Sequence, residues 1–303
     1  MMDIIYKKET GIYPDPFIRT MVKGTDMDAF GPAQIRRDLL IDLAGSNLSE
    51  DEERLRILIK SSDVVINLVG ILYETKKQKF EDIHAKFPDL LSKLCSELNI
   101  KKLVHISALG INETVSSQYM QSKLKGEKNI INNFDRSVIL RPSVIFGPED
   151  KFFNQFASLA EFFPALPLIG GGLTYFQPIY VGDVAKSIMT VLEKEEISNK
   201  IYELGGPQIF TFKELMKILL KEINKKRFLV PVPFLFAKFQ AKILQLLPKP
   251  LLTTDQVEML KYDNIVTNKY PTLKDLKINP KTIESILPNY IWRFRKGGQF
   301  AKL

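Results

Sequence analysis

A tyrosine with a lysine four residues further on is the arrangement in this sequence that could most readily do chemistry. Tyr119 and Lys123 share one face if their segment is helical, because residues four apart lie together on a helix. A free phenol has a pKa of about 10, and a neighbouring cation favours its ionised form. The pair could therefore move a proton, with the lysine also able to hold a ribose hydroxyl.

The spacing alone is a weak indication, because it occurs at Tyr73/Lys77, Tyr119/Lys123 and Tyr270/Lys274. Tyr73 lies in a loop after an apolar run, and Tyr270 precedes a proline. Only Tyr119 opens an expected helix after a strand that ends at Ser107, which places it near the carboxyl ends of strands, where open α/β sheets bind ligands. A surface pair on an amphipathic helix is the alternative interpretation.

The elements that would position this pair alternate along the chain. Apolar runs predict strands near residues 36–42, 64–69, 102–107 and 137–141. Apolar residues at three- and four-residue steps predict helices over about 49–61, 79–98 and 117–134. This alternation predicts an α/β fold with a Rossmann-type, doubly wound parallel sheet.

Two further stretches would reach the ligand edge of such a sheet. Asn67 ends one strand and Gly70 follows it, and a small residue there lets a ligand approach the backbone. The run LRPSVIFGP at 140–148 leaves a strand through two prolines. A simple strand exit explains this second stretch equally well.

Composition narrows the class of protein. With 45% hydrophobic and 26% charged residues the chain is typical of a globular protein. A single cysteine excludes an internal disulfide and, with only two histidines, argues against any metal site. We expect no membrane span, no signal peptide and a cytoplasmic protein. The net charge of +8 reflects either a general surface bias or an anionic partner, and no motif points to nucleic acid.

The segment 234–247 is apolar on most sides, with Lys238, Lys242 and Gln245 on one stripe. It is too short to span a bilayer. The favoured interpretation is a buried helix of a C-terminal lobe. The alternatives are a helix that lies in a membrane interface, which would make the protein peripheral on the inner membrane, or one that docks on a partner.

As a set, the motifs of the chain resemble the extended and atypical short-chain dehydrogenase/reductase superfamily, which includes the NAD-dependent epimerases and dehydratases. The resemblance is strongest to the branch with the NAD(P)H-binding accessory subunits of respiratory complex I and their bacterial relatives. The motifs are NLVGILYE (67–74), LVHISALG (103–110), Tyr119/Lys123 with Gly126-Glu127, LRPSVIFGPED (140–150), FFNQFA (152–157), PLIGGG (167–172), QPIYVGDVA (177–185), YELGGP (202–207), TFKEL (211–215) and TTDQVEML (253–260).

This resemblance implies roles for individual residues. Tyr119 would be the catalytic acid/base, Lys123 would hold the nicotinamide ribose, and Ser107 lies near the catalytic hydroxyl. The neighbours Ala108 and Leu109 replace hydroxyl residues common in active epimerases, so the group that would polarise a carbonyl is open. The cofactor would be NAD(P)(H), with NADPH slightly favoured, and its binding residues would be Asn67, Gly70, Lys123, Pro142, Ser143 and Val144.

The chain departs from the family pattern at its front. Residues 1–33 carry no glycine-rich turn after an apolar strand, and Asn47 stands where an adenine-contacting aspartate is usual. Either the start is misassigned or frameshifted, which we favour, or the first βαβ unit has degenerated. We expect an atypical segment (1–33), a dinucleotide-binding domain (34–150 and 173–204) and a substrate-side lobe (151–172 and 205–303).

Two functions fit these features. The favoured one is a binding and assembly protein that holds NAD(P)H and supports a membrane-associated respiratory complex. The alternative is an NAD(P)-dependent oxidoreductase or epimerase acting on a quinone precursor or nucleotide sugar, suggested by the retained Tyr119/Lys123 pair. A degenerate protein that binds no cofactor is a third reading.

We predict that this chain binds a dinucleotide weakly, because residues 1–33 carry no recognisable pyrophosphate cradle. Such a cradle supplies several charge-assisted backbone hydrogen bonds of roughly 1.5–3 kcal/mol each. Titration of the purified protein with NADPH, followed by nucleotide fluorescence, measures the affinity. Micromolar binding would contradict the prediction and reveal a cradle of another kind in residues 1–33.

Overall fold

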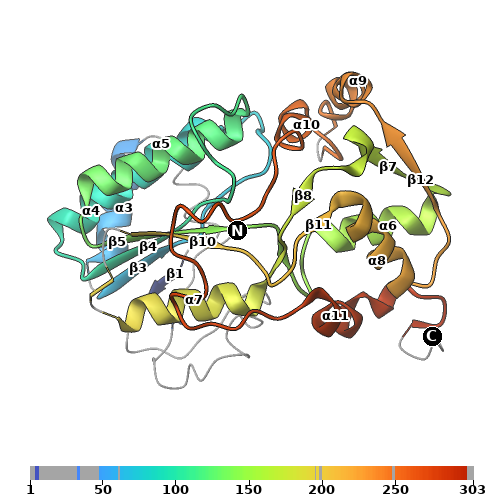
Figure 1. Cartoon of the computed structure of the whole chain (residues 1–303). Coiled ribbons are helices and arrows are strands. Elements are labelled where there is room, and N and C mark those ends of the chain that lie inside the picture. Colours follow the sequence, from blue (N-terminus) through green and yellow to red (C-terminus); the bar gives the residue numbers. More distant parts are fainter. Residues whose placement is uncertain are drawn as a thin grey trace.

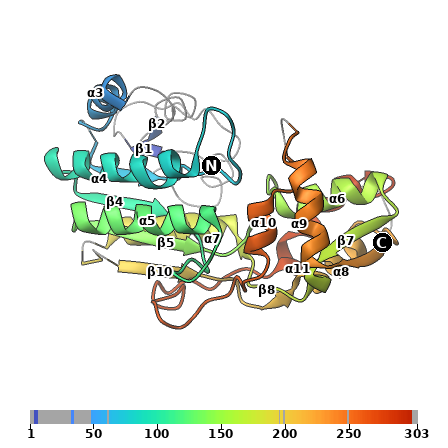
Figure 2. The same cartoon turned by 90° about the horizontal axis from the view of Figure 1, so that it is seen from above.

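The computed structural model of the chain describes residues 4–6, 33–34, 48–60, 62–194, 196–197, 200–247 and 250–298. A sheet with helices on both faces forms one part, and a lobe built mainly from the C-terminal third lies beside it (Figures 1 and 2). The strand expected near 36–42 and Asn47 lie outside the described residues.

The central sheet has the strand order β10-β5-β4-β3-β1-β2. Its parallel members are β3 (Val64–Asn67), β4 (Lys102–Ile106), β5 (Ser137–Pro142) and β10 (Lys200–Leu204). Every residue of β4 and β5 is buried, as a central strand covered on both faces requires. The sheet therefore confirms the expected α/β fold. Two short strands, β1 (Ile4–Tyr6) and β2 (Ala33–Gln34), extend it in antiparallel fashion beyond β3.

Helices cover both faces of this sheet. On one face lie α3 (Leu48–Ile59), α4 (Phe87–Glu97) and α5 (Gln118–Asn133), which share a core with β3 and β4. On the other face lies α7 (Val181–Glu193). The helix expected over 79–98 contains a π-helical stretch, η2 (Glu81–Lys86), directly before α4. Such π-turns often occur at functional sites.

The second lobe packs around an aromatic core that includes Phe146, Phe153 and Phe212. Its elements are β6 (Ile145–Phe146), α6 (Phe152–Phe162), β7 (Ala165–Ile169), η3 (Gly170–Gly172), β8 (Tyr175–Phe176), β9 (Ile179–Tyr180), β11 (Phe210–Thr211), α8 (Phe212–Glu222), β12 (Phe228–Val232), α9 (Phe234–Leu244), α10 (Thr254–Met259), α11 (Ile283–Ile286), α12 (Pro288–Ile291) and η4 (Trp292–Phe294). Aromatic rings pack between α6 and α8, where the ring centroids of Phe156 and Phe212 lie 5.3 Å apart.

The interpretation of 234–247 as a buried helix is wrong. Within α9 only Ala237 and Ala241 are buried. Leu235 is 86% exposed and Phe239 is 63% exposed, so the larger apolar side chains point away from the lobe. A helix that is apolar on nearly all sides gives no periodic signal for its buried face, and here two alanines form that face. No helix in the described part of the chain is long and apolar enough to cross a membrane.

Candidate functional site

Three of the expected site residues, Asn67, Ser107 and Lys123, come together where β3 and β4 end. Asn67 and His105 are direct neighbours in the register of these strands, and Ser107 continues the same side of β4. Side chains alternate along a strand, so all three lie on the face that α4 and α5 cover. The Lys123 ammonium reaches this point from α5 and donates to the Ile106 carbonyl at 3.2 Å.

Several polar atoms at this point have no protein partner among the described residues. They are Asn67 Nδ2, both ring nitrogens of His105 and the hydroxyl of Ser107, and all three residues are buried. A buried polar atom left unpaired costs about 1–3 kcal/mol. Together with the Lys123 cation, this set suits a polar ligand rich in hydroxyl groups, such as the ribose half of a dinucleotide.

Tyr119 lies near this cluster but is sealed from solvent. The residue is 5% exposed, and its ring meets those of Phe80 and His84 edge-on at 5.8 and 5.2 Å. Burial raises the pKa of the phenol, and the Asp255 carboxylate raises it further. The expectation that Lys123 would lower this pKa is therefore wrong. Desolvation penalises the ionised phenol and keeps Tyr119 neutral.

A histidine that the sequence analysis left without a role connects these residues. The Ile71 amide donates to Nε2 of His84 at 3.0 Å, and Nδ1 lies 3.0 Å from the Ser122 hydroxyl. Nε2 must accept, so the ring proton is on Nδ1 and is donated to Ser122, whose hydroxyl donates to the Tyr119 carbonyl at 2.8 Å. Burial, Lys123 and His105 together lower the pKa of His84 to about 2.

A buried ion pair fixes α5 against the sheet one turn beyond Lys123. Arg141 of β5 donates through Nε and an Nη to the two carboxylate oxygens of Glu127, at 2.9 and 2.5 Å. The guanidinium also lies over the Tyr270 ring, 4.8 Å from its centroid. Such a bidentate pair fixes an orientation as well as a distance. It explains why glutamate follows Gly126 in the α5 motif and arginine precedes Pro142.

The segment after β5, expected near the nicotinamide, is tied to a residue that sequence reasoning missed. The Ser143 hydroxyl lies 2.6 Å from Oδ1 of Asn264, and the Val144 amide donates to the same oxygen at 3.1 Å. Nδ2 of Asn264 donates to the Leu109 carbonyl at 2.9 Å. Asn264 therefore joins the ends of β4 and β5. It stands in no motif, and only its long-range contacts identify it.

The other expected cofactor residues are spread along the same edge. The Asn67 side-chain oxygen accepts from the Val69 amide at 3.0 Å and turns the chain toward Gly70, which is half-buried. Pro142 ends β5 and pairs in register with Leu204 of β10. Asn67 and Pro142 are thus separated by β4, which carries Ser107 beyond its end. A ligand that contacts all of them has to be extended along the edge of the sheet.

The parallel sheet with helices on both faces defines a Rossmann-type α/β protein. The family model of the NAD dependent epimerase/dehydratase family matches residues 20–205. The chain belongs to this family.

Named relatives are subunits of a respiratory enzyme. NADH dehydrogenase [ubiquinone] 1 alpha subcomplex subunit 9 of Arabidopsis thaliana is 33% identical over 82% of this chain and 64% of its own length. The mouse subunit of the same name is 32% identical over 78% of the chain and 63% of its own length. The chain thus spans a little under two thirds of these relatives.

Solved structures share the fold at low identity. The dTDP-4-dehydrorhamnose reductase of Bacillus anthracis, solved with NADP, superposes with a TM-score of 0.61 at 14% identity and covers 90% of this chain and 93% of its own. The UDP-glucose 4-epimerase of Thermotoga maritima, solved with UDP-glucose, gives 0.61 at 18% identity and 82% of each chain. Both likenesses support the Rossmann-type architecture.

The low pKa of His84 predicts a pH dependence of stability. Unfolded histidine titrates near 6.5, whereas folded His84 stays neutral down to about 2. Above pH 6.5 neither state binds this proton. Below it only the unfolded chain does, so the free energy of unfolding falls as the pH drops, by about 1.4 kcal/mol per pH unit for one histidine.

We expect His84→Gln to remove this part of the dependence. Urea denaturation of the parent chain and of the variant between about pH 7.5 and 5.5 measures the free energy of unfolding of each, and this pH range brackets the pKa of an unfolded histidine. His105 and the carboxylates are common to both proteins, so the difference between the two slopes isolates His84. Parallel profiles would mean that His84 takes up a proton in the folded chain.

Proposed function

We propose that this chain is a NAD(P)(H)-binding subunit with a binding and assembly role in a membrane-associated respiratory complex. One observation carries the proposal: Tyr119, the residue that would do acid/base chemistry, is sealed by its own chain and held neutral. The similarity to subunits of NADH dehydrogenase points to the same kind of role.

The residues at the strand ends fit the nicotinamide ribose half of the cofactor. Lys123 would donate to a ribose hydroxyl, and the Ser107 hydroxyl would add a hydrogen bond, since it lacks a protein partner among the described residues. The Asn67 amide, unpaired in the same way, would lie on the adenosine side. Gly70 would allow close approach on the adenosine side, while Pro142, Ser143 and Val144 would line the nicotinamide side. When bound, the cofactor would supply the capacity for hydride transfer.

We expect the part of the site that would bind the cofactor phosphates to contribute least to affinity. Residues 1–33 contain no glycine-rich turn, so the proposal includes impaired affinity for the dinucleotide. NADPH remains the slightly favoured form, because the chain carries a net charge of +8, which suits an additional phosphate.

An enzymatic function is the second candidate, and the Tyr119/Lys123 pair on α5 favours it. In that case the chain would be an NAD(P)-dependent oxidoreductase or epimerase, acting on a quinone precursor or nucleotide sugar, with Tyr119, Lys123 and Ser107 as catalytic residues. This function requires α10 to move, since its Met259 packs against the Tyr119 cluster.

The proposal places the protein on the cytoplasmic face of a membrane, in contact with its surface through residues 234–247. The exposed face of α9 carries large apolar side chains and two lysines, Lys238 and Lys242. The helix contains no acidic residue. This combination suits the headgroup region of a bilayer that contains anionic lipids.

Substitutions at the pair separate the binding function from the enzymatic one. In a version of the chain with a glycine-rich first unit added, Lys123→Ala should weaken NADPH affinity by about 1–2 kcal/mol, the value of a lost charge-assisted hydrogen bond. Tyr119→Phe should leave affinity unchanged. Lys125→Ala is the matched control, because that lysine lies on the exposed side of α5. Turnover of a substrate that disappears with Tyr119→Phe would favour the enzyme.

Assembly is tested in membranes of the source cell. We expect an affinity-tagged chain to migrate in native gels with NADH dehydrogenase activity, and deletion of the chain to reduce the amount of assembled complex. A chain that migrates only at its own mass, and whose deletion leaves the complex intact, would contradict the assembly role.

A further inference from the structure

The first turn of α5 is capped by a carboxylate from α10, far away in the sequence. Oδ1 of Asp255 accepts from the Gln118 amide at 2.7 Å, and Oδ2 accepts from the Ser117 hydroxyl at 2.8 Å and the Tyr119 amide at 3.2 Å. Amides in the first turn of a helix have no partner within the helix, and negative charge is favoured there. The start of the helix that carries Tyr119 therefore depends on α10.

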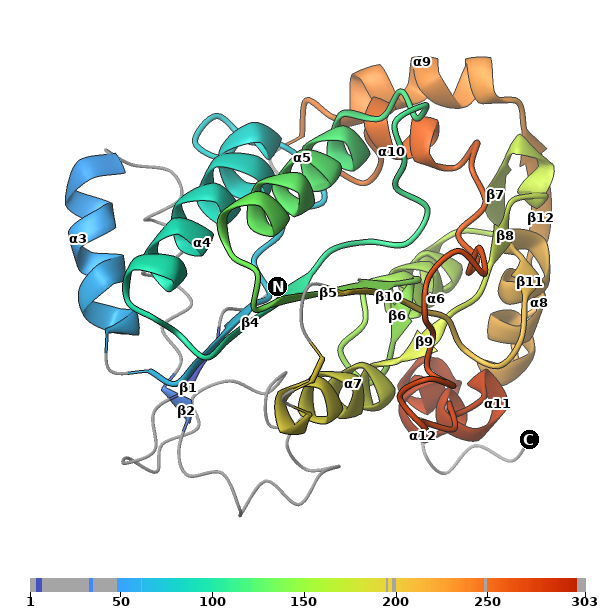
Figure 3. The same ribbon diagram turned by 60° about the vertical axis from the view of Figure 1, so that its left-hand side comes forward.

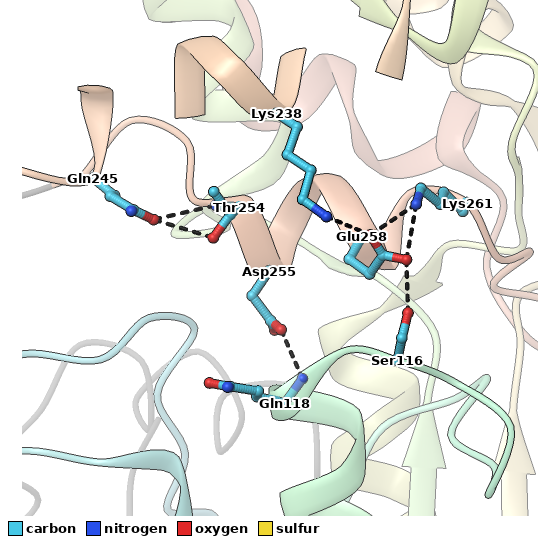
Figure 4. Close-up of polar contacts among 8 residues, drawn as sticks. All are labelled: Ser116, Gln118, Lys238, Gln245, Thr254, Asp255, Glu258 and Lys261. Carbon is cyan, nitrogen blue, oxygen red and sulfur yellow. Dashed lines mark hydrogen bonds and ion pairs between the residues drawn. The ribbon is translucent and has the colours of Figure 1, made fainter. Parts of the chain in front are cut away.

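A second contact lies one turn further along α10. Glu258 accepts from the Ser116 hydroxyl at 2.6 Å and pairs with Lys261 at 2.8 Å and Lys238 at 3.6 Å (Figure 4). The hydrogen bonds from Lys261 and Ser116 lower the pKa of Glu258 and keep it charged. Asp255 and Glu258 thus hold the segment before α5 at two points, which we call the latch.

The latch holds α10 over Tyr119. Met259 and Tyr262, which are partly buried, pack against the cluster of Phe80, Tyr119 and Met120. Tyr119 and Met120 are 5% and 3% exposed in this arrangement. With the latch closed, no substrate can reach the phenol from this side.

Helices α9 and α10 form one unit (Figure 3). Ala237 and Ala241 of α9 are buried against Val257 of α10, and the Gln245 side chain accepts from the Thr254 hydroxyl at 3.2 Å. Lys238 of α9 pairs with Glu258 of the latch. A displacement of α9 would therefore move α10 with it.

We propose that α9 and α10 form a lid over Tyr119, latched by Asp255 and Glu258, which opens when α9 inserts into the surface of an anionic bilayer. This inference rests on the proposed membrane contact and on Tyr119 as part of the cofactor site. An anionic bilayer is the occupant that the charges select, because α9 carries two lysines and no acid. Lipid phosphates would compete with Glu258 for Lys238.

Hydroxyl-radical footprinting with mass spectrometry tests the latch on the full chain. The rates at which Tyr119 and Met120 are oxidised report the exposure of their side chains to solvent. We expect Asp255→Ala to raise both rates several-fold. Asp275→Ala is the matched control, because its carboxylate accepts from the Thr272 amide at 2.7 Å away from α5. Met216, fully buried in the second lobe, serves as the internal reference for folding.

Unchanged rates at Tyr119 and Met120 in Asp255→Ala would overturn the latch. If Met216 also becomes reactive, the variant has lost its fold, and Glu258→Ala then decides, since it removes the other contact of the latch and leaves Asp255 on the first turn of α5. A raised rate at Tyr119 with Met216 protected in that variant supports the latch, and an unchanged rate overturns it.

Vesicles test the coupling in the unmodified protein. Sedimentation with phosphatidylcholine vesicles, with and without phosphatidylglycerol, measures docking, and footprinting of the same samples measures opening. We expect docking and faster oxidation of Tyr119 only with the anionic lipid, and a smaller response of both in a Lys242→Gln variant, which changes a lysine of α9 other than the one that pairs with Glu258. Docking without faster oxidation overturns the coupling but leaves the membrane contact intact. Absence of docking overturns the membrane contact itself, whereas the Asp255 result stands independently.

Discussion

The close packing of α5 on η2 is the constraint on which the candidate site depends. A Cβ atom on Gly126 would lie 1.9 Å from the His84 carbonyl oxygen, so only glycine allows this approach. At this distance the side chains on the inner face of α5 reach the layer beneath: Ser122 meets His84, Lys123 meets the end of β4, and Glu127 meets Arg141. A wider separation would leave each of these polar groups buried and unpaired.

This packing places a cation and several neutral polar groups in a region with little water. The arrangement is favourable only if other groups accept hydrogen bonds from them. Glu127 balances Arg141 within the chain, whereas His105 and Ser107 find no such partner among the described residues. Under the proposed function, a ribose would supply hydrogen-bond partners to these groups. Burial also raises the pKa of Tyr119, so the phenol stays neutral.

The sequence predicted the parts of this structure that depend on local pattern. Apolar runs located β3, β4 and β5, and the spacing of Tyr119 and Lys123 placed both on α5. Contacts between distant segments could not be predicted in this way, because Asp255 and Asn264 acquire their partners only through the tertiary fold. The exposed face of α9 was missed for another reason: an apolar residue predicts burial, and nothing in the pattern shows that two alanines suffice.

Helix α5 therefore belongs to both parts of the molecule. Its middle is fixed to the sheet by Glu127 and Lys123, while its first turn is completed by Asp255 of the second lobe. The segments that follow β4 and β5 are joined to the same lobe through Asn264. A shift of that lobe would change the surroundings of Tyr119, whereas the hydrogen bond from Lys123 to the Ile106 carbonyl lies within the sheet part. The polar groups at the strand ends and the access to the phenol thus depend on contacts in different parts of the fold.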